Sequence, residues 1–167
     1  MNLPESVSQS ALLERTGGIY ADVQRDRRVL PDRVCSLIEK IKEGLARPWA
    51  DLMELYSYAN PIVAWYFDQG FQEVPLHEAV SGLAVDIVKM FDIEKILSQV
   101  QLILDRPDAP EFLPGIYSIF KSLRMAFTPD GRIDPVRYDD LARQLRRLTA
   151  PHRPYLGKNI DRAIFYI

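Results

Sequence analysis

Few residues in this sequence are of the types that most often carry out catalysis. It contains one cysteine, Cys35, and two histidines, His77 and His152. A cysteine nucleophile needs a neighbouring base or cation that lowers the pKa of its thiol. Cys35 instead lies within a strongly periodic apolar pattern, so we predict a packed residue. His77 and Ser81 would share one helix face, but no nucleophile elbow accompanies them. We interpret His77 as a capping or surface histidine, and the sequence favours a non-enzymatic role.

Metal and phosphate sites also lack their motifs. Neither histidine lies in an HExxH, ExxH or HxH pattern. The segment 128–131, Thr-Pro-Asp-Gly, is similar to part of a calcium loop, but placing Gly131 at the sixth loop position puts Ala126 first and Arg137 twelfth, where calcium requires carboxylates. The pair Gly17-Gly18 is followed by neither a Walker lysine nor a GxGxxG pattern. We therefore expect no metal and no cofactor, and a plain turn at 128–131.

Large aromatic side chains are concentrated between residues 49 and 71. At 100° per residue, Tyr56 and Tyr58 would point about 200° apart on a helix, so one face cannot bury them all. Exposed Tyr and Trp side chains are enriched at protein interfaces, whereas the competing interpretation is an aromatic core around a tightly packed helix. The candidate binding residues are Trp49, Tyr56, Tyr58, Trp65, Tyr66 and Phe71.

Charge is distributed unevenly along a chain whose net charge is only −2. Residues 1–50 carry eight basic and seven acidic side chains (+1), residues 51–115 carry three and eleven (−8), and residues 116–167 carry ten and five (+5). Such opposite charges would steer a partner or neutralise one another within the fold, and we favour the second. A nucleic-acid interface is disfavoured, because Asp139 and Asp140 share a predicted helix with four of the arginines and no aromatics alternate with them. The four are Arg137, Arg143, Arg146 and Arg147, and the helix is followed by Arg153, Lys158 and Arg162.

The overall composition predicts one globular domain. The chain has 167 residues, of which 47% are hydrophobic and 26% charged, enough to bury a core without a metal or a disulfide. The first residues lack the basic and apolar regions of a signal peptide, and no stretch approaches about 18 uninterrupted apolar residues. With a single cysteine, these features predict a cytoplasmic protein without a membrane span.

Proline, glycine and capping residues predict an all-α fold, a compact single-domain bundle of about six to eight helices without significant sheet. One helix should begin at Pro31 and end near Gly44, and a second should run from Pro48 until Pro61 interrupts it. A short helix would follow Asn60 as N-cap and end at Gly70. The most apolar helix should begin at Pro75, and a new one should start at Asp92.

The predicted domain, residues 1–167, divides into four parts. Residues 1–30 should form weak N-terminal helices separated at Gly17-Gly18, and residues 31–105 the central helices. Residues 106–115 read as a proline-rich loop. Residues 116–167 should contain C-terminal basic helices, one of them from Asp134-Pro135 to Leu148, and a docked apolar tail at 163–167.

These features favour a protein-interaction module, such as an adaptor, accessory subunit or regulator, that binds another protein or a second copy through its aromatic-rich surface. One alternative is a helical receptor for an apolar small molecule, held between the aromatic segment and the small residues 79–84 of the central helix. Another is a nucleic-acid-binding regulator that uses the C-terminal arginines. An open apolar groove would support the first function, an enclosed cavity the second, and a contiguous arginine surface the third.

Overall fold

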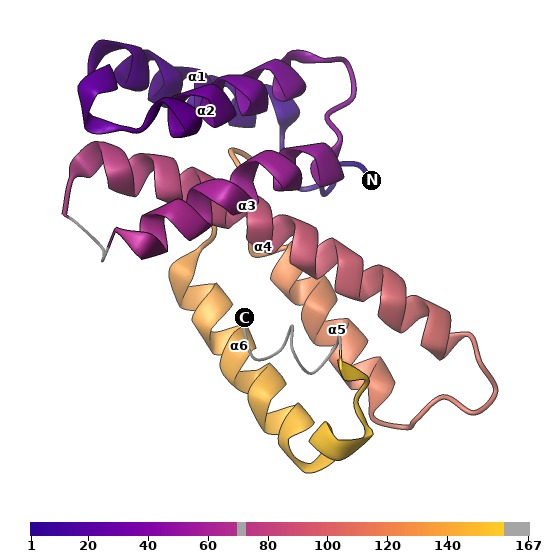
Figure 1. Ribbon diagram of the computed structural model, residues 1–167. Helices are drawn as coiled ribbons and strands as arrows, with labels where there is room; N and C mark the ends of the chain where they lie inside the picture. The colour runs from indigo at the N-terminus through magenta and orange to yellow at the C-terminus, as the bar shows by residue number, and fades with distance from the viewer. Residues whose placement is uncertain (70–72, 159–167) are drawn as a thin grey trace. The chain divides into compact units, whose positions relative to one another are not determined.

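The computed structural model describes residues 1–69 and 73–158, and these residues form helices (Figure 1). No strand occurs in the described ranges, where isolated bridges join Asn2 to Asp51 and Phe127 to Ile133. The predicted all-α fold class with six to eight helices is therefore confirmed. The α-helices are α1 (Gln9–Arg25), α2 (Asp32–Ala46), α3 (Leu52–Asp68), α4 (Pro75–Leu104), α5 (Leu113–Arg124) and α6 (Pro135–Thr149), and short 3-10 helices cover Arg27–Val29 and Ala150–Tyr155.

The chain divides into two compact units, each with its own buried residues. Unit 1 consists of Met1–Phe91 and Pro129–Arg132, and unit 2 of Asp92–Thr128 and Ile133–Ile167. Helix α4 contributes its first part to unit 1 and its last part to unit 2. The prediction that residues 1–167 form one domain stays a prediction.

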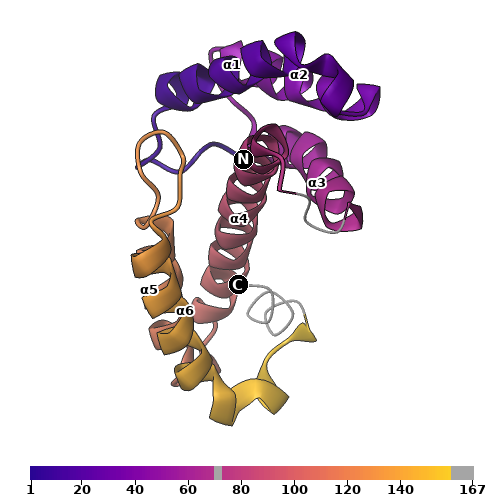
Figure 2. The ribbon, with the colours of Figure 1, turned by 90° about the vertical axis from the view of Figure 1, so that its left-hand side faces the viewer.

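Unit 1 is built on the packing of α1 against α2 and of α2 against α3 (Figures 1 and 2). The close approach of α2 and α3 depends on Gly44, which is buried inside α2. An added Cβ atom at this position would lie 3.2 Å from the Leu55 Cδ2 atom of α3. This packing requirement explains why Gly44 does not end the helix as predicted, and why α2 continues to Ala46.

Helix α1 corrects the prediction of two weak helices separated at Gly17-Gly18, because it is one continuous helix through both glycines. Its N-cap is Ser8, whose hydroxyl accepts a hydrogen bond from the Ala11 amide at 3.2 Å. Each helical glycine costs about 1 kcal/mol relative to alanine. The buried stripe of Leu12, Thr16, Ile19 and Val23 offsets this cost through packing, which the local sequence does not reveal.

Helix α3 corrects the prediction that Pro61 separates two helices. The helix begins at Leu52, after Asp51 accepts a hydrogen bond from the Met53 amide at 2.9 Å, and it continues through Pro61 to Asp68. A proline inside a helix costs about 3 kcal/mol. Pro61 is exposed, and residues on both sides of it bury one continuous face, which consists of Leu52, Leu55, Ala59, Ile62 and Trp65.

Helix α4 corrects the prediction of a new helix at Asp92, because it runs without interruption from Pro75 to Leu104 (Figure 2). Phe91 and Ile93 on either side of Asp92 are buried, so the apolar stripe does not end there. Asp92 itself is half-buried, and this burial raises the pKa of its carboxyl above the ordinary value, with Lys95 opposing the effect.

Cys35 and His77, whose residue types often take part in catalysis, both lie in the core of unit 1. Cys35 is buried, as predicted for a packed residue. His77 is buried as well, which corrects its assignment to a cap or the surface. Its Nε2 atom lies 2.9 Å from the Val29 carbonyl oxygen, and its ring meets the edge of Trp65 at a centroid distance of 5.0 Å. The histidine therefore links α4 to the chain before α2 and to α3.

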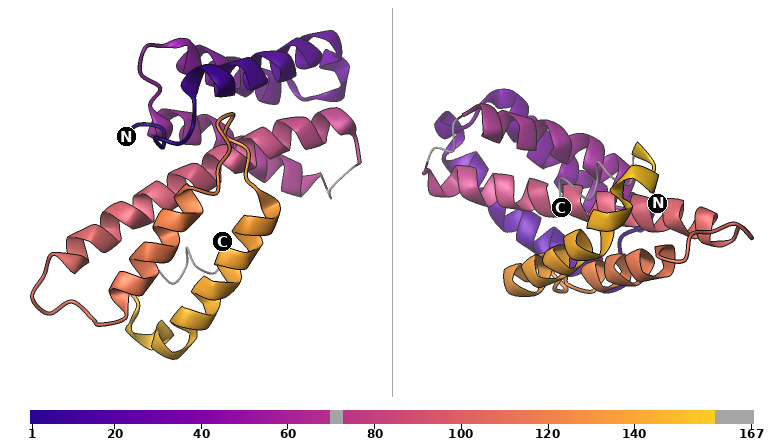
Figure 3. Two further views of the ribbon diagram at one scale, coloured as in Figure 1. Left: turned by 180° about the vertical axis from the view of Figure 1, so that it is seen from behind. Right: turned by 90° about the horizontal axis from the view of Figure 1, so that it is seen from below.

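Unit 2 contains the pair α5 and α6, which pack side by side (Figure 3). Helix α6 begins as predicted, with the Asp134 carboxylate accepting hydrogen bonds from the Val136 and Arg137 amides. Helix α5 begins at Leu113, so the predicted loop 106–115 is shorter than expected. Gly115 lies within α5, where an added Cβ atom would be 3.1 Å from Leu148. The predicted tail at 163–167 lies outside the described residues.

Candidate functional site

The predicted aromatic binding residues divide between surface and core. Trp49 precedes α3 and is 81% exposed, whereas Trp65 in the same segment is only 2% exposed. Tyr56 is half-buried and stacks on Phe91 with a centroid distance of 4.1 Å. Tyr66 is half-buried, with its ring centroid 6.4 Å from that of Phe67. The segment therefore contributes some aromatic side chains to the core and leaves others exposed, and their role in binding stays a prediction.

Tyr58 and Phe71 complete the set of predicted aromatic binding residues. Tyr58 is half-buried and donates a hydrogen bond to the Glu54 carboxylate at 3.0 Å, and this bond raises the pKa of the phenol above its ordinary value. Glu54 also binds the Arg47 guanidinium at 2.7 Å. Tyr58 is therefore held in a polar network at the start of α3. Phe71 lies outside the described residues.

The exposed side of α3 carries no charge over four helical turns. Its members lie within about 40° of the Met53 direction at 100° per residue, and all of them are exposed. Apolar side chains stand at both ends, with Met53 56% and Phe67 54% exposed. Solvent-facing sides of helices usually carry charged residues. We call this surface the α3 face, and it consists of Met53, Ser57, Asn60, Ala64 and Phe67.

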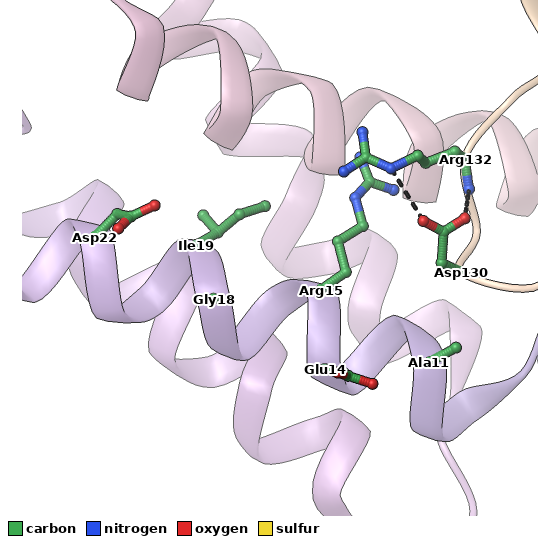
Figure 4. A pocket seen from close by; sticks show the side chains of 8 residues that line it. All are labelled: Ala11, Glu14, Arg15, Gly18, Ile19, Asp22, Asp130 and Arg132. Carbon is green, nitrogen blue, oxygen red and sulfur yellow. Dashed lines mark hydrogen bonds and ion pairs between the residues drawn. The ribbon is translucent and has the colours of Figure 1, made fainter.

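A second candidate site is a hollow of about 460 Å³ beside α1 (Figure 4). One wall is the side of α1 that carries Arg15 and Gly18, and the other is the turn that contains Asp130 and Arg132. The turn depends on Gly131, whose φ of +78° is a conformation that favours glycine. We call this site the α1 hollow, and its lining residues are Ala11, Glu14, Arg15, Gly18, Ile19, Asp22, Asp130 and Arg132.

Arg15, one of the residues that line the α1 hollow, forms an ion pair that links α1 to α4. An Arg15 Nη2 atom donates to the Asp86 carboxylate at 2.8 Å, and the two side chains are only 7% and 14% exposed. Burial raises the pKa of Asp86, while Arg15, Lys89 and Arg132 lower it by smaller amounts. Asp86 therefore interacts electrostatically with three cations. Two of these, Arg15 and Arg132, are the arginines that line the hollow.

The Arg15 guanidinium is only partly satisfied. Its Nε and Nη1 atoms are buried and have no hydrogen-bond partner among the described residues. Arg132, which also lines the hollow, binds Asp130 through its Nε atom at 3.0 Å (Figure 4). Buried donors without acceptors are costly, so the two Arg15 atoms lower the stability that its ion pair contributes.

Sequence reasoning missed the α1 hollow because its lining comes from two distant parts of the chain, α1 and the turn 129–132. The one local signal is the position of Arg15, about 70° from the centre of the buried stripe of α1 at 100° per residue. Charged residues line both this hollow and a smaller one of about 210 Å³ at Tyr20, Glu39, Lys42, Glu43 and Ala46. Both therefore give little support to a receptor for an apolar ligand.

The C-terminal arginines lie in unit 2, and α6 carries four of them at exposed positions. Asp139 and Asp140 are exposed on the same helix, so the arginines do not form an uninterrupted basic surface. Arg153 lies in the following 3-10 helix, and Arg162 lies outside the described residues. This arrangement does not strengthen the nucleic-acid alternative.

Residues 1–69 and 73–158 lack the features of two other classes of site. They contain no group of three or more His, Cys, Asp or Glu side chains placed to hold a metal ion. No helix in these ranges combines the length and the apolar character needed to cross a membrane. Comparison of the chain with protein-family models, curated proteins and solved structures finds no match.

Proposed function

We propose that this chain is a protein-interaction module that binds an apolar helical segment of another protein along the α3 face. The observation that carries the proposal is the row of five exposed, uncharged residues on α3, with the 81% exposed Trp49 directly before the helix. At 1.5 Å per residue, the row from Met53 to Phe67 extends over about 21 Å, the length of a short partner helix.

The composition of the α3 face fits a helical partner. The exposed Ala64 and Ser57 are small, so the backbone of a second helix can approach closely between them. Met53 and Phe67 would supply larger apolar contacts at the two ends, and Met adapts its shape to different partners. Trp49 would act as an anchor, since exposed tryptophans are among the residues that contribute most to binding. The partner would be an amphipathic helix with an apolar stripe.

A photoreactive amino acid at Ala64 tests the proposal inside cells. We expect it to form a specific adduct, whereas the same group at Ala21, an exposed alanine of α1, should form none. Mass spectrometry of the adduct identifies the partner segment and distinguishes another protein from a second copy of this chain. A synthetic peptide of that segment should bind the wild type and bind Met53→Glu and Phe67→Glu at least tenfold more weakly.

Three results would contradict this function. Adducts of equal yield from Ala64 and Ala21 would show that the α3 face has no preference for a partner. A peptide that binds the wild type and both glutamate variants equally would place its contacts elsewhere. An adduct between two copies of the chain would replace the proposed partner by self-association, which sedimentation of the purified protein would measure directly.

A further inference from the structure

Trp49 lies at the centre of residues 47–51, the loop that joins α2 to α3 (Figure 1). We infer that Gln9 is a positioning residue for partner binding, because its side chain fixes this loop and thereby presents Trp49 to the partner. The inference rests on the proposed function, in which Trp49 is an anchor. Gln9 lies in the first turn of α1, 36 to 41 positions away from the residues that it contacts.

The Gln9 side-chain amide forms hydrogen bonds on both sides of Trp49. Its Nε2 atom donates to the carbonyl oxygens of Leu45 at 2.9 Å and Arg47 at 2.5 Å. Its Oε1 atom accepts from the Ala50 amide at 3.3 Å. These bonds use two donors and one acceptor at once, which an amide group supplies and an ionised carboxylate or an ammonium group does not. The side chain therefore joins the last turn of α2 to the residue that follows Trp49.

Other contacts hold the two ends of the same loop. Pro48 fixes one backbone dihedral angle directly before Trp49, and Ala50 directly after it is buried. The Arg47 guanidinium binds both oxygens of the Glu54 carboxylate, at 2.7 Å and 2.8 Å. The backbone on either side of Trp49 is therefore held in place, while the Trp49 side chain itself is exposed.

A loop that is already fixed favours binding. Ordering a flexible loop in a complex costs free energy, and a loop that has its bound conformation beforehand avoids this cost. Without the Gln9 amide, the two carbonyl oxygens would bond to water and the backbone around Trp49 would have fewer fixed points. The effect of Gln9 on affinity should then pass through Trp49 and disappear when the indole is removed.

Nuclear magnetic resonance of the free, full chain tests whether Gln9 fixes the loop. Gln9→Met keeps the length of the side chain and removes its hydrogen bonds, and Gln9→Glu removes only the two that it donates. In both variants we expect hydrogen exchange at the Ala50 amide to become at least about tenfold faster and the backbone order parameter of Trp49 to fall. Gln24→Met, at an exposed position of the same helix, is the matched control and should change neither. An unchanged order parameter of Trp49 in the Gln9 variants would overturn the inference.

A double-mutant cycle tests whether Gln9 acts through Trp49. The probe is the synthetic peptide of the partner segment that is captured at position 64, and calorimetry measures its affinity. Gln9→Met should weaken binding at least about fivefold in the wild type and less than about twofold in Trp49→Ala. A merely structural role would weaken binding equally in both backgrounds, which would overturn the inference while the proposed function stands. Failure of the wild type to capture any segment would instead overturn the proposed function, and the inference with it.

Discussion

The α1 hollow and the α3 face belong to the same unit but place charge in opposite ways. The hollow is lined by charged residues, among them Arg15, which forms a buried ion pair with Asp86. The α3 face exposes five residues that carry no charge. The hollow is lined by two distant parts of the chain, whereas the α3 face lies on a single helix. Folding should therefore depend on the residues of the hollow and be nearly indifferent to those of the α3 face.

The largest effect should follow from removing one member of the buried ion pair. Asp86→Ala leaves the Arg15 guanidinium buried without its acceptor, so we expect a loss of about 3–5 kcal/mol in the free energy of unfolding. The double variant Arg15→Met with Asp86→Leu should recover most of this loss, since it removes both charges and keeps the volume. Chemical denaturation measures both. A loss below about 1 kcal/mol for Asp86→Ala would show that folding does not depend on the pair.

A smaller loss should follow from changing the turn that forms the second wall of the hollow. Gly131 has a φ of +78°, and an added Cβ atom would lie 2.9 Å from Leu12 and 3.0 Å from Met90. The left-handed conformation alone costs about 1–2 kcal/mol for alanine, so Gly131→Ala should destabilise by at least this amount in chemical denaturation. Gly17→Ala is the control, and it should stabilise α1 by about 0.5–1 kcal/mol. Equal effects of the two substitutions would contradict the assigned backbone strain.

The Asp86 carboxyl, which is buried against Arg15, should also give the protein a specific dependence on pH. Burial raises the pKa of Asp86 above 3.8, against the opposing effects of Arg15, Lys89 and Arg132. The folded state then holds this proton more tightly than the unfolded state, so the contribution of Asp86 to stability is largest below pH 3.8 and falls as the pH rises through the raised pKa.

Denaturation midpoints between pH 3 and pH 7 test this sign. Asp86→Asn removes the titrating carboxyl. The denaturation midpoint of this variant should therefore lack the decrease with rising pH that Asp86 causes in the wild type. Asp68→Asn, at an exposed position at the end of α3, serves as the control and should leave the fall in place. Parallel pH profiles for the wild type and Asp86→Asn would refute the assignment.

Local sequence signals predicted the helices where capping and apolar spacing agreed. Asp134-Pro135 started α6 as expected, and Pro75 started α4. The predictions failed where tertiary packing outweighs a local preference. Gly17-Gly18 and Pro61 do not interrupt their helices, because each helix buries one face along its whole length. Such packing involves residues distant in the sequence and leaves no local signal.

The same distinction applies to the two candidate sites. The concentration of aromatics led to the segment that contains α3, and helical geometry showed that some of them had to be exposed. It did not separate Trp49 from Trp65, because their burial depends on the packing of α3 against its neighbours. The α1 hollow was not predictable, since α1 and the turn 129–132 are far apart in the sequence and no spacing rule connects them.

Substitutions on the α3 face should have the smallest effects on stability. They test directly whether folding, which depends on residues of the hollow, is independent of this surface. Met53→Glu and Phe67→Glu change side chains that are 56% and 54% exposed, so each should alter the free energy of unfolding by no more than about 0.5 kcal/mol. Both variants should nevertheless lose partner binding at least tenfold, because a charge on either end would be buried in the complex.

Trp65→Glu is the matched control for these substitutions, because Trp65 lies on the same helix with only 2% of its surface exposed. Its ring packs against His77, and a carboxylate there would be buried without a partner, so unfolding should become easier by at least about 3 kcal/mol. Chemical denaturation of the three variants thus separates the two sides of α3. A large loss of stability for Met53→Glu or Phe67→Glu would mean that these side chains serve folding, and loss of binding in such a variant would then carry no information about a partner.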